Sequence, residues 1–400
     1  MRTSGTYRVE AVMDFLPDYG YEIEVVTLPT EWMEYQSRQE LTGAVVDAHQ
    51  PEGATDRFVR YLSTVRYLNW VQRAIMVPDL LALWARAAAR KMARELEGID
   101  LVYGTSPPYS GMVAAQRLAD RLGVPCVQEL RDPPSFHRAL RRRSSFYIWR
   151  MVRFERRYLR KADRIITVTP RTRLRLLELH PGLDPDRMHV VTNGYPDIDV
   201  DPALAGRDPA KFTVTYVGTF QGSVKARESS VFTPAVLLEG LTALPAEKVS
   251  LRIVGSVSGQ QKKNLKKLDP NGVTEFVGLV DREVALAETA AADVAVILAD
   301  DDDWWIGRKA FEYLRHAHTI LAVVPPGDTT DLLESHSRSD VVSPNDLRPI
   351  PAVLQRRFDE WSRGDWERGP LPDQIQTDEA CVAGIERVLS TALGEVTPKI

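Results

Sequence analysis

The chain has 400 residues, of which 44% are hydrophobic and 26% charged, and its formal net charge at pH 7 is −4. This length is more than one hydrophobic core usually organises, so we expect two domains of roughly 150–200 residues each. A charge so near zero argues against a dedicated nucleic-acid-binding protein, and no apolar run approaches the roughly 18 residues that a membrane-spanning helix needs.

The N-terminal segment "SGTYR" (residues 4–8) is interpreted as a loop that leads into a helix, with Gly5 at the helix N-terminus and Arg8 in its first turn. No strand precedes it, although a doubly wound sheet normally begins with a strand that ends in such a loop. We therefore expect the true start to lie upstream, so that the first strand is missing here. On composition alone, a plain turn residue is the simpler interpretation of Gly5.

Short β-branched runs then alternate with longer amphipathic stretches, a pattern typical of βαβ units around a parallel sheet. In the first half of the chain we predict strands at 22–28, 101–106, 124–129, 164–169 and 188–193. Between the second and third of these, residues 109–122 place apolar side chains at helical spacing, which predicts a helix with one buried face.

The segment "QELRDPP" (128–134) places Arg131 and Asp132 just past the carboxyl end of a predicted strand. Pro133 favours an extended conformation for Asp132 and ends the strand there. Ligands of doubly wound sheets bind beyond the carboxyl ends of the strands, so this carboxylate is placed to bind hydroxyl groups. An equal alternative is that Asp132 pairs with Arg131 or caps the next element.

The stretch "RALRRRSSFYIWRMVRFERRYLRKADR" (138–164) is strongly basic and carries interleaved aromatic residues, with Glu155 as the one acid between Arg138 and Lys161. A basic amphipathic helix with aromatic side chains is typical of a surface that meets anionic lipid headgroups. Its membrane-facing residues would be Arg141, Arg142, Arg143 and Trp149. A solvated helix face is the ordinary alternative, and no nucleic-acid recognition motif accompanies the stretch.

Residues 193–211 are rich in Pro, Asp and Gly and lack periodicity, so we place the domain boundary there. After this boundary the alternation resumes, and several runs are almost continuously apolar, as in strands covered on both faces. The predicted strands of the second half are 213–218, 249–255, 273–278, 293–298 and 319–324.

The sequence thus predicts an α/β protein with two Rossmann-like, doubly wound parallel-sheet domains that face each other across a cleft. We expect residues 1–196 to form the first domain and residues 197–375 the second. The remaining residues, 376–400, form a C-terminal helix that can pack back on the first domain.

The segment "YVGTFQGSVKAR" (216–227) follows the first predicted strand of the second domain. Gly218 and Gly222 allow the backbone to approach a ligand closely, and Lys225 and Arg227 can neutralise phosphate charge. The segment matches neither GxGxxG nor a P-loop. Any strand-to-helix connection can use glycine, so a plain loop remains an alternative.

The segment "GRKAFEYLRHAHTILAVVPPG" (307–327) reads as a helix that feeds a buried strand. Lys309 and Glu312 share one helix face. A carboxylate beside a strand end can accept hydrogen bonds from two ribose hydroxyls, and an ammonium group in the first helical turn suits a diphosphate. The alternative is a surface ion pair worth a few tenths of a kcal/mol.

Two further features bear on cofactors and compartment. The cysteines, Cys126 and Cys381, match no metal or redox spacing, so we expect two buried free thiols in a reducing compartment. The acidic run at 300–303 is interpreted as a loop at the rim of the cleft, and no metal site is predicted. We expect a cytoplasmic protein, at most peripheral on the inner face of the cell membrane, because no signal peptide precedes the first helix.

Taken in order, these segments resemble the family 4 glycosyltransferases, which are retaining enzymes with the two-domain GT-B fold. The resemblance covers nearly the whole chain, and its most specific part is the Lys-x-Phe-Glu-Tyr-Leu helix followed by the Ile-Leu-Ala-Val strand. It rests on the segments "SGTYR", "VPDLLALW", "YGTSPPYS", "LRDPP", "ADRIITVTP", "VVTNGYPD", "YVGTF", "FVGLV", "AAADVAVIL" and "GRKAFEYLRHAHTILAVVPPG".

The resemblance implies a nucleotide-diphospho-sugar donor in the second domain and a hydroxyl acceptor, on a glycan or a lipid-linked molecule, in the first. Glu312 matches the family's ribose-binding glutamate, and a basic residue such as Lys309 often accompanies it. The other implied donor-binding residues are Gly218, Thr219, Lys225, Arg227, Gly5 and Val280. Asp132 follows the strand whose end contributes to the sugar and acceptor site and is the implied catalytic residue. No cofactor or metal is implied.

One departure concerns the family's second glutamate, which commonly helps to hold the transferred sugar and lies eight residues before the ribose-binding one. Here that position is Trp304. The resemblance implies retaining sugar transfer in envelope polysaccharide or glycoconjugate synthesis. The alternatives are a nucleotide-sugar epimerase on the same fold and a non-catalytic partner subunit.

Overall fold

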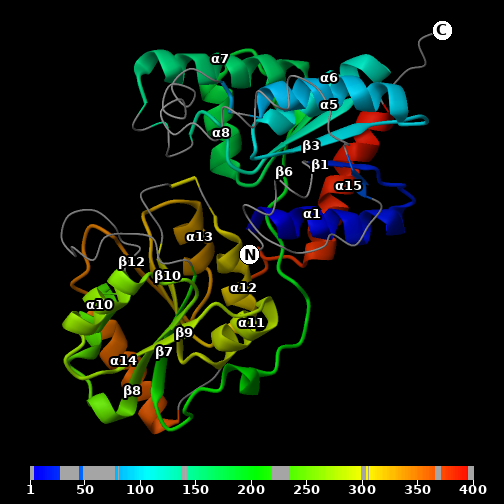
Figure 1. Cartoon of the computed structure of the whole chain (residues 1–400). Helices are drawn as coiled ribbons and strands as arrows, with labels where there is room; N and C mark the ends of the chain where they lie inside the picture. The colour runs from blue at the N-terminus through cyan, green and yellow to red at the C-terminus, as the bar shows by residue number, and fades with distance from the viewer. Residues whose placement is uncertain are drawn as a thin grey trace. The chain divides into compact units, whose positions relative to one another are not determined.

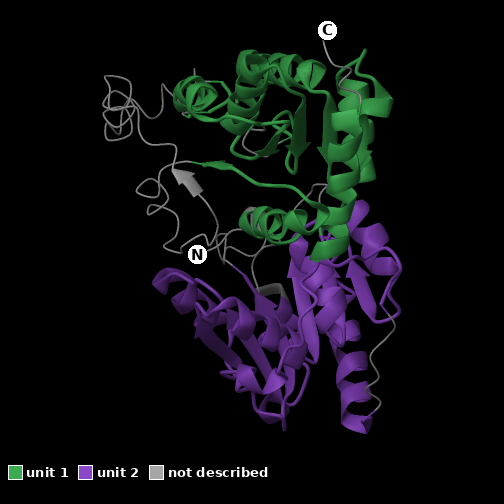
Figure 2. Ribbon diagram, turned by 90° about the vertical axis from the view of Figure 1, so that its right-hand side faces the viewer, with its two compact units in different colours: residues 1–193, 378–400 green, residues 194–377 purple. Residues whose placement is uncertain are grey.

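The chain divides into two compact units, and each has its own parallel sheet (Figures 1 and 2). Unit 1 comprises residues 1–193 and 378–400, and unit 2 comprises residues 194–377. The computed structural model describes residues 4–27, 45–47, 77–79, 81–136, 140, 143–218, 235–298, 303–304, 306–364 and 371–394.

Unit 1 contains a four-stranded parallel sheet in the order β3-β4-β5-β6 and a separate parallel pair, β1-β2. The strands are β1 Val25–Thr27, β2 Val45–Asp47, β3 Val102–Ser106, β4 Cys126–Leu130, β5 Arg164–Thr167 and β6 Met188–Val190. The helices are α1 Ser4–Phe15, α5 Ala82–Glu95, α6 Ser110–Leu122, α7 Ser145–Lys161, α8 Pro170–Leu179 and α15 Asp378–Gly394, with 3-10 turns η1 Leu16–Tyr19 and η3 Pro185–Arg187.

Helices cover both faces of the four-stranded sheet, which explains why β4 and β5 are buried along their whole length. Side chains alternate between the two faces. Val127 and Ile166 pack against α1 and α15, whereas Leu130 and Ile165 pack in the core shared with α5, α6, α7 and α8. The C-terminal helix α15 is therefore part of the core of unit 1.

Unit 2 contains a six-stranded parallel sheet in the order β12-β11-β10-β7-β8-β9. Its strands are β7 Phe212–Val217, β8 Val249–Val254, β9 Thr274–Gly278, β10 Val294–Leu298, β11 Ile320–Val323 and β12 Ser339–Val342. Its helices are α9 Ala235–Leu241, α10 Gly259–Leu268, α11 Arg282–Ala291, α12 Arg308–His316, α13 Asp328–Glu334 and α14 Ile350–Arg363, with 3-10 turns η4 Pro202–Ala205 and η5 Ala246–Lys248.

The central strand β10 shows how this sheet is covered. Val294 and Val296 pack with α9, α10 and α14, whereas Ala295 and Ile297 pack with α12 and α13 on the opposite face (Figure 1). The strand order reverses between β7 and β10, because the chain winds outward from β7 in one direction and later from β10 in the other. Ligands of open α/β sheets bind at such a switch point, beyond the carboxyl ends of the strands.

The predicted fold class, α/β with Rossmann-like parallel sheets in two groups, is confirmed. Each of the ten predicted strands has a counterpart within a few residues, but β2 and β12 were not predicted. Cys126 and Cys381 are buried free thiols, as expected. Among the described helices, none is both long and apolar enough to cross a membrane.

Candidate functional site

Three neighbouring strands in unit 2 each have a valine–glycine step at their carboxyl ends. In β7 and β8 the glycine directly follows the strand, as Gly218 and Gly255, and in β9 it is the last residue of the strand, Gly278. The Gly218 amide donates to the Val254 carbonyl at 2.8 Å, and the Gly255 amide donates to the Gly278 carbonyl at 2.7 Å. A Cβ at Gly255 would overlap the Gly218 carbonyl group. The chain after β8 thus passes the end of β7 too closely for a side chain at Gly255, so backbone is presented beside the switch point.

We expect Gly255→Ala to lower the free energy of unfolding of unit 2 by about 2–4 kcal/mol, because the new methyl group meets backbone that cannot move aside and the φ of +130° disfavours alanine. The matched control is Gly259→Ala at the start of α10, where a Cβ meets open space. This control should be neutral or stabilising by up to about 1 kcal/mol. Urea unfolding followed by circular dichroism compares the two variants, and equal effects would show that the strand ends are not closely packed.

Lys309, in the first turn of α12, reaches the end of β7. Its Nζ donates to the Val217 carbonyl at 2.5 Å and lies 5.8 Å from the centre of the Tyr216 ring. A Cβ at Gly218 would collide with this Nζ, so the glycine provides the space for the ammonium group. Although much of the Lys309 side chain is exposed, desolvation of the ammonium group lowers its pKa, and the charge of Glu312 offsets part of that effect.

Glu312, one turn further along α12, has only 14% of its side chain exposed. Its Oε1 accepts from Arg308 Nε at 3.1 Å and from Arg282 Nη2 at 3.2 Å, so Oε2 accepts neither of these bonds. Lys309 and Glu312 therefore bind different partners and do not simply pair across the helix surface. A carboxylate has about four lone-pair sites, which leaves acceptor capacity for a ligand.

Arg282 and Arg308 are site residues that the sequence interpretation missed. Arg308 is buried and lies four residues before Glu312, a spacing that brings two side chains together on a helix. Arg282 begins α11, four residues after the last residue of β9 and two after Val280, which is half-buried. With Lys309, these arginines give three cations around a single carboxylate, a set that suits a ligand with phosphate groups and hydroxyls.

In unit 1, the N-terminal segment forms the first turns of α1, which includes Gly5. Arg8 is buried, and its guanidinium group forms hydrogen bonds inside the core of unit 1. Its Nε bonds Glu129 Oε1 at 2.6 Å, its Nη1 donates to the Thr192 carbonyl at 2.8 Å, and its Nη2 donates to the Val191 carbonyl at 2.9 Å. This arginine thus ties α1 to β4 and to the segment that follows β6.

Asp132 lies two residues beyond β4 and is half-buried. Burial, followed by the negative charge of Asp132, raises the pKa of the nearby Tyr109 hydroxyl. Arg131 donates from Nη2 to the Pro107 carbonyl at 2.8 Å. Asp132 therefore stands next to polar side chains of unit 1 at the end of its sheet.

Several predicted residues lie outside the described part of the chain. These are Thr219, Lys225 and Arg227, which follow β7 in the sequence, and Arg141 and Arg142, which precede α7. Trp304, at the position of the family's second glutamate, is buried. Its indole occupies a place where the resemblance implied a carboxylate.

Comparisons with known proteins bear on both units. A family model described as a glycosyl transferase 4-like domain matches residues 5–194. The solved structure of HepE from Anabaena, in complex with UDP and glucose, is similar with a TM-score of 0.54 and 14% sequence identity, over 76% of this chain and 82% of that one. No curated protein matches the chain by sequence.

Two further solved structures share the fold. Sucrose-phosphate synthase from Thermosynechococcus elongatus has a TM-score of 0.59 and 16% identity, over 79% of this chain and 78% of that one. A glycosyltransferase from Rickettsia africae has a TM-score of 0.55 and 12% identity, over 97% and 91% of the two chains. Residues 5–194 therefore match a glycosyl transferase 4-like domain, and the two units share the GT-B fold of these solved structures.

Proposed function

We propose that this protein transfers a sugar, with retention of configuration, from a nucleotide-diphospho-sugar to a hydroxyl of a glycan or lipid-linked acceptor, in envelope polysaccharide or glycoconjugate synthesis. One observation carries the proposal. At the switch point of unit 2, Lys309 Nζ lies on the last carbonyl of β7, beside the backbone of Gly218, and Glu312 follows one turn later. This is where open α/β sheets bind nucleotides.

The donor would be held by groups of opposite charge. Lys309 and Arg282 neutralise the diphosphate, together with Lys225 or Arg227 from the segment that follows Gly218 in the sequence. Glu312 accepts from the two ribose hydroxyls. The backbone next to Gly218 allows the phosphates to approach closely, and the base lies near Val280. In unit 1, we propose Gly5 and Asp132 as the residues that bind the sugar and the acceptor. The resemblance to HepE, which was solved with UDP and glucose, supports this class of donor.

The chemistry would need no protein nucleophile, cofactor or metal. The acceptor hydroxyl attacks from the face that the leaving diphosphate vacates, and that diphosphate helps to take up the proton. The protein then contributes positioning, and cations that stabilise the charge developing on the departing phosphate. Because Trp304 replaces the family's second glutamate, we propose that the sugar is held by other groups than in most relatives.

The test is turnover with a panel of nucleotide-diphospho-sugars and of glycan and lipid-linked acceptors. The proposal expects transfer that depends on the acceptor, and proton NMR coupling constants of the product that show the anomeric configuration of the donor. An isomerised donor without acceptor would instead identify an epimerase. Binding of a nucleotide sugar without turnover across the panel would identify a non-catalytic subunit.

We also propose that α7 docks this protein on an anionic lipid surface, peripheral to the inner face of the cell membrane. Phe146 and Trp149 are 66% and 57% exposed, and their rings stack with centroids 5.9 Å apart. Arg150 and Arg153 lie over these two rings at 5.8 and 6.0 Å. The one acid of the helix, Glu155, is buried, so the exposed face combines aromatic side chains with positive charge alone.

The double substitution Phe146→Ala/Trp149→Ala should weaken binding to vesicles of phosphatidylglycerol and phosphatidylcholine by about tenfold or more, because burying one large apolar side chain is worth about 1.5–3 kcal/mol. The control is Leu174→Ala on α8, which removes a side chain that is also 55% exposed. Vesicle co-sedimentation measures both. Equal binding of all three proteins, or equal binding to vesicles of phosphatidylcholine alone, would exclude docking through this face.

A further inference from the structure

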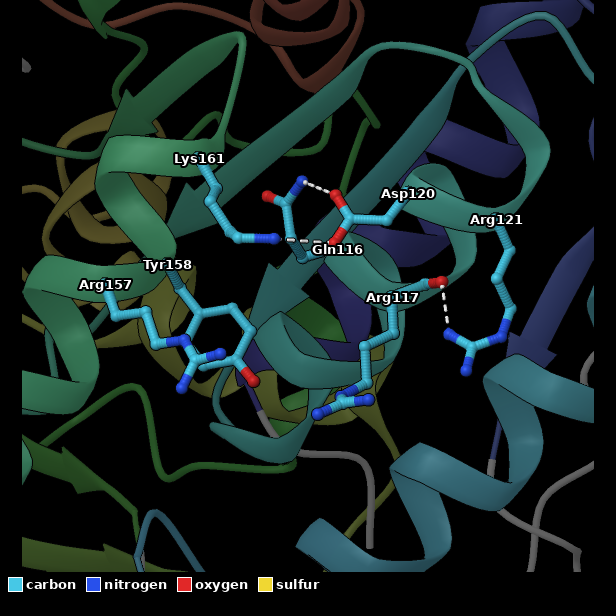
Figure 3. A pocket seen from close by; sticks show the side chains of 7 residues that line it. All are labelled: Gln116, Arg117, Asp120, Arg121, Arg157, Tyr158 and Lys161. Atoms are coloured by element: carbon cyan, nitrogen blue, oxygen red, sulfur yellow. Dashed lines mark hydrogen bonds and ion pairs between the residues drawn. The ribbon is translucent and has the colours of Figure 1, made fainter.

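A pocket of about 150 Å³ opens between α6 and α7 of unit 1 (Figure 3). Four cationic side chains line it: Arg117, Arg121, Arg157 and Lys161. Asp120 is its one carboxylate, so the formal charge of the lining is 4 − 1 = +3. Its volume corresponds to about five water molecules, which is enough for one phosphate-sized anion.

The carboxylate in the pocket is already bound at both oxygens. Asp120 Oδ2 accepts from Lys161 Nζ at 2.7 Å, and Oδ1 accepts from Gln116 Nε2 at 3.0 Å. These bonds gather the acid and the lysine at one end of the pocket, as Figure 3 shows. The ammonium group and the carboxylate neutralise each other there, so the net charge of the pocket comes from its three arginines.

The arginines are arranged around the other end. Arg121 donates from Nη1 to the Arg117 carbonyl at 3.0 Å and so lies back along α6. Arg117 Nε is buried and has no hydrogen-bond partner among the described residues. Figure 3 shows the side chains of Arg117 and Arg157 on either side of the Tyr158 hydroxyl. Clustered guanidinium groups repel one another, and a phosphate that accepts from their planar forks removes that repulsion.

We propose that this pocket binds one phosphate group, between Arg117 and Arg157 and next to the Tyr158 hydroxyl. The site lies wholly in unit 1, on elements that the proposed donor site in unit 2 does not use. The group can come from a soluble phosphate ester or from the headgroup of an anionic lipid. Both sources offer the same ligand chemistry, which is negatively charged oxygen acceptors. Because α7 forms one wall of the pocket and also carries the proposed membrane-docking residues Phe146 and Trp149, a lipid headgroup can reach the pocket from the membrane surface.

The test replaces the two arginines at that end of the pocket, as Arg117→Gln/Arg157→Gln. The matched control is Arg86→Gln/Arg90→Gln, which removes the same charge from two exposed positions on α5 outside the pocket. Both variants also carry Lys309→Ala, so that phosphate binding in unit 2 does not contribute. Titration with inorganic phosphate at constant ionic strength, followed by phosphorus NMR, measures the affinity, and circular dichroism checks folding.

We expect the pocket variant to bind phosphate about a hundredfold more weakly or worse, because two guanidinium groups no longer donate charge-assisted hydrogen bonds to the anion. We expect the control to bind as the Lys309→Ala parent does. Equal affinity in both variants, or an equal loss in both, would overturn the proposal. A second arm separates the sources. If glycerol phosphate releases the protein from phosphatidylglycerol vesicles only when the pocket is intact, the ligand is a lipid headgroup; vesicle binding unchanged in the pocket variant assigns a soluble ester.

Discussion

Glu312→Ala is expected to weaken the binding of a nucleotide-diphospho-sugar by about a hundredfold or more. The carboxylate is proposed to accept from two ribose hydroxyls, and a hydrogen bond to a charged group contributes about 1.5–3 kcal/mol. Because the ribose lies far from the bond that breaks, the substitution should raise KM more than it lowers kcat. Titration calorimetry with the donor, together with steady-state rates, measures both effects.

Glu334→Ala on α13 is the matched control, since it removes an exposed carboxylate of the same unit. Removing Glu312 also takes a partner from Arg282 and Arg308, so thermal unfolding must show that unit 2 stays folded. Glu312→Gln keeps the shape of the side chain and should still lose affinity, because the neutral amide is the weaker acceptor. Donor affinity equal to that of the control would remove Glu312 from the site.

Arg8→Met should lower the free energy of unfolding of unit 1 by about 3–5 kcal/mol, the usual cost of breaking a buried ion pair by removing one partner. The substitution leaves the Glu129 carboxylate buried without its cation and the carbonyls of Val191 and Thr192 without their donor. Urea unfolding with a probe in unit 1 measures the loss. The double variant Arg8→Met/Glu129→Met should recover much of it, because no buried charge then remains uncompensated.

The same pair predicts how acid affects unit 1. Burial alone would raise the pKa of Glu129, but Arg8 and then Arg131 lower it below its usual value. The folded state therefore holds the proton less tightly than the unfolded state. The stabilisation is complete above the pKa of an unfolded glutamate and is lost as the pH falls through the lower folded value.

If Arg8→Met unfolds at the same urea concentration as the unchanged protein, the buried Arg8–Glu129 pair does not stabilise unit 1.

The sequence was sufficient to predict ten of the twelve described strands, and the omission of β12 has a physical reason. Strands such as β10 are buried on both faces and so appear as continuous runs of Val, Ile and Ala. The edge strand β12, by contrast, has the sequence Ser-Asp-Val-Val and is mostly half-buried, because one side of an edge strand has no neighbour. Too few apolar residues remained in it for the pattern to stand out.

The candidate site was predicted only where its residues are neighbours along the chain. Lys309 and Glu312 lie on one helix, and their spacing was enough to single them out. Arg282 lies on the preceding helix, 30 residues before Glu312, and no local sequence pattern predicts the bond between them. The valine–glycine step recurs after β7, after β8 and at the end of β9, and this repetition was the one available sign that Gly255 belongs to the same edge as Gly218.

Arg8 is a residue whose structural role could not be predicted from the sequence. The sequence placed it near the start of a predicted helix without indicating what it binds, and in the structure its guanidinium bonds Glu129 and two backbone carbonyls inside unit 1. Glu129 is the buried acid that decides this, and it lies 121 residues away in β4. Burial of an ionic pair depends on which strand faces which helix, and that information is not present in the spacing of either residue.

Calorimetric titration with UDP, GDP and ADP, and with the corresponding monophosphates, tests the central claim most directly. The account predicts that at least one diphosphate binds at a single site, that its monophosphate binds far more weakly, and that Lys309→Ala abolishes most of the difference. Such a result would place a diphosphate at the end of β7. The account would be contradicted if none of the three diphosphates binds. It would also be contradicted if monophosphate and diphosphate bind equally well, both to the unchanged protein and to Lys309→Ala.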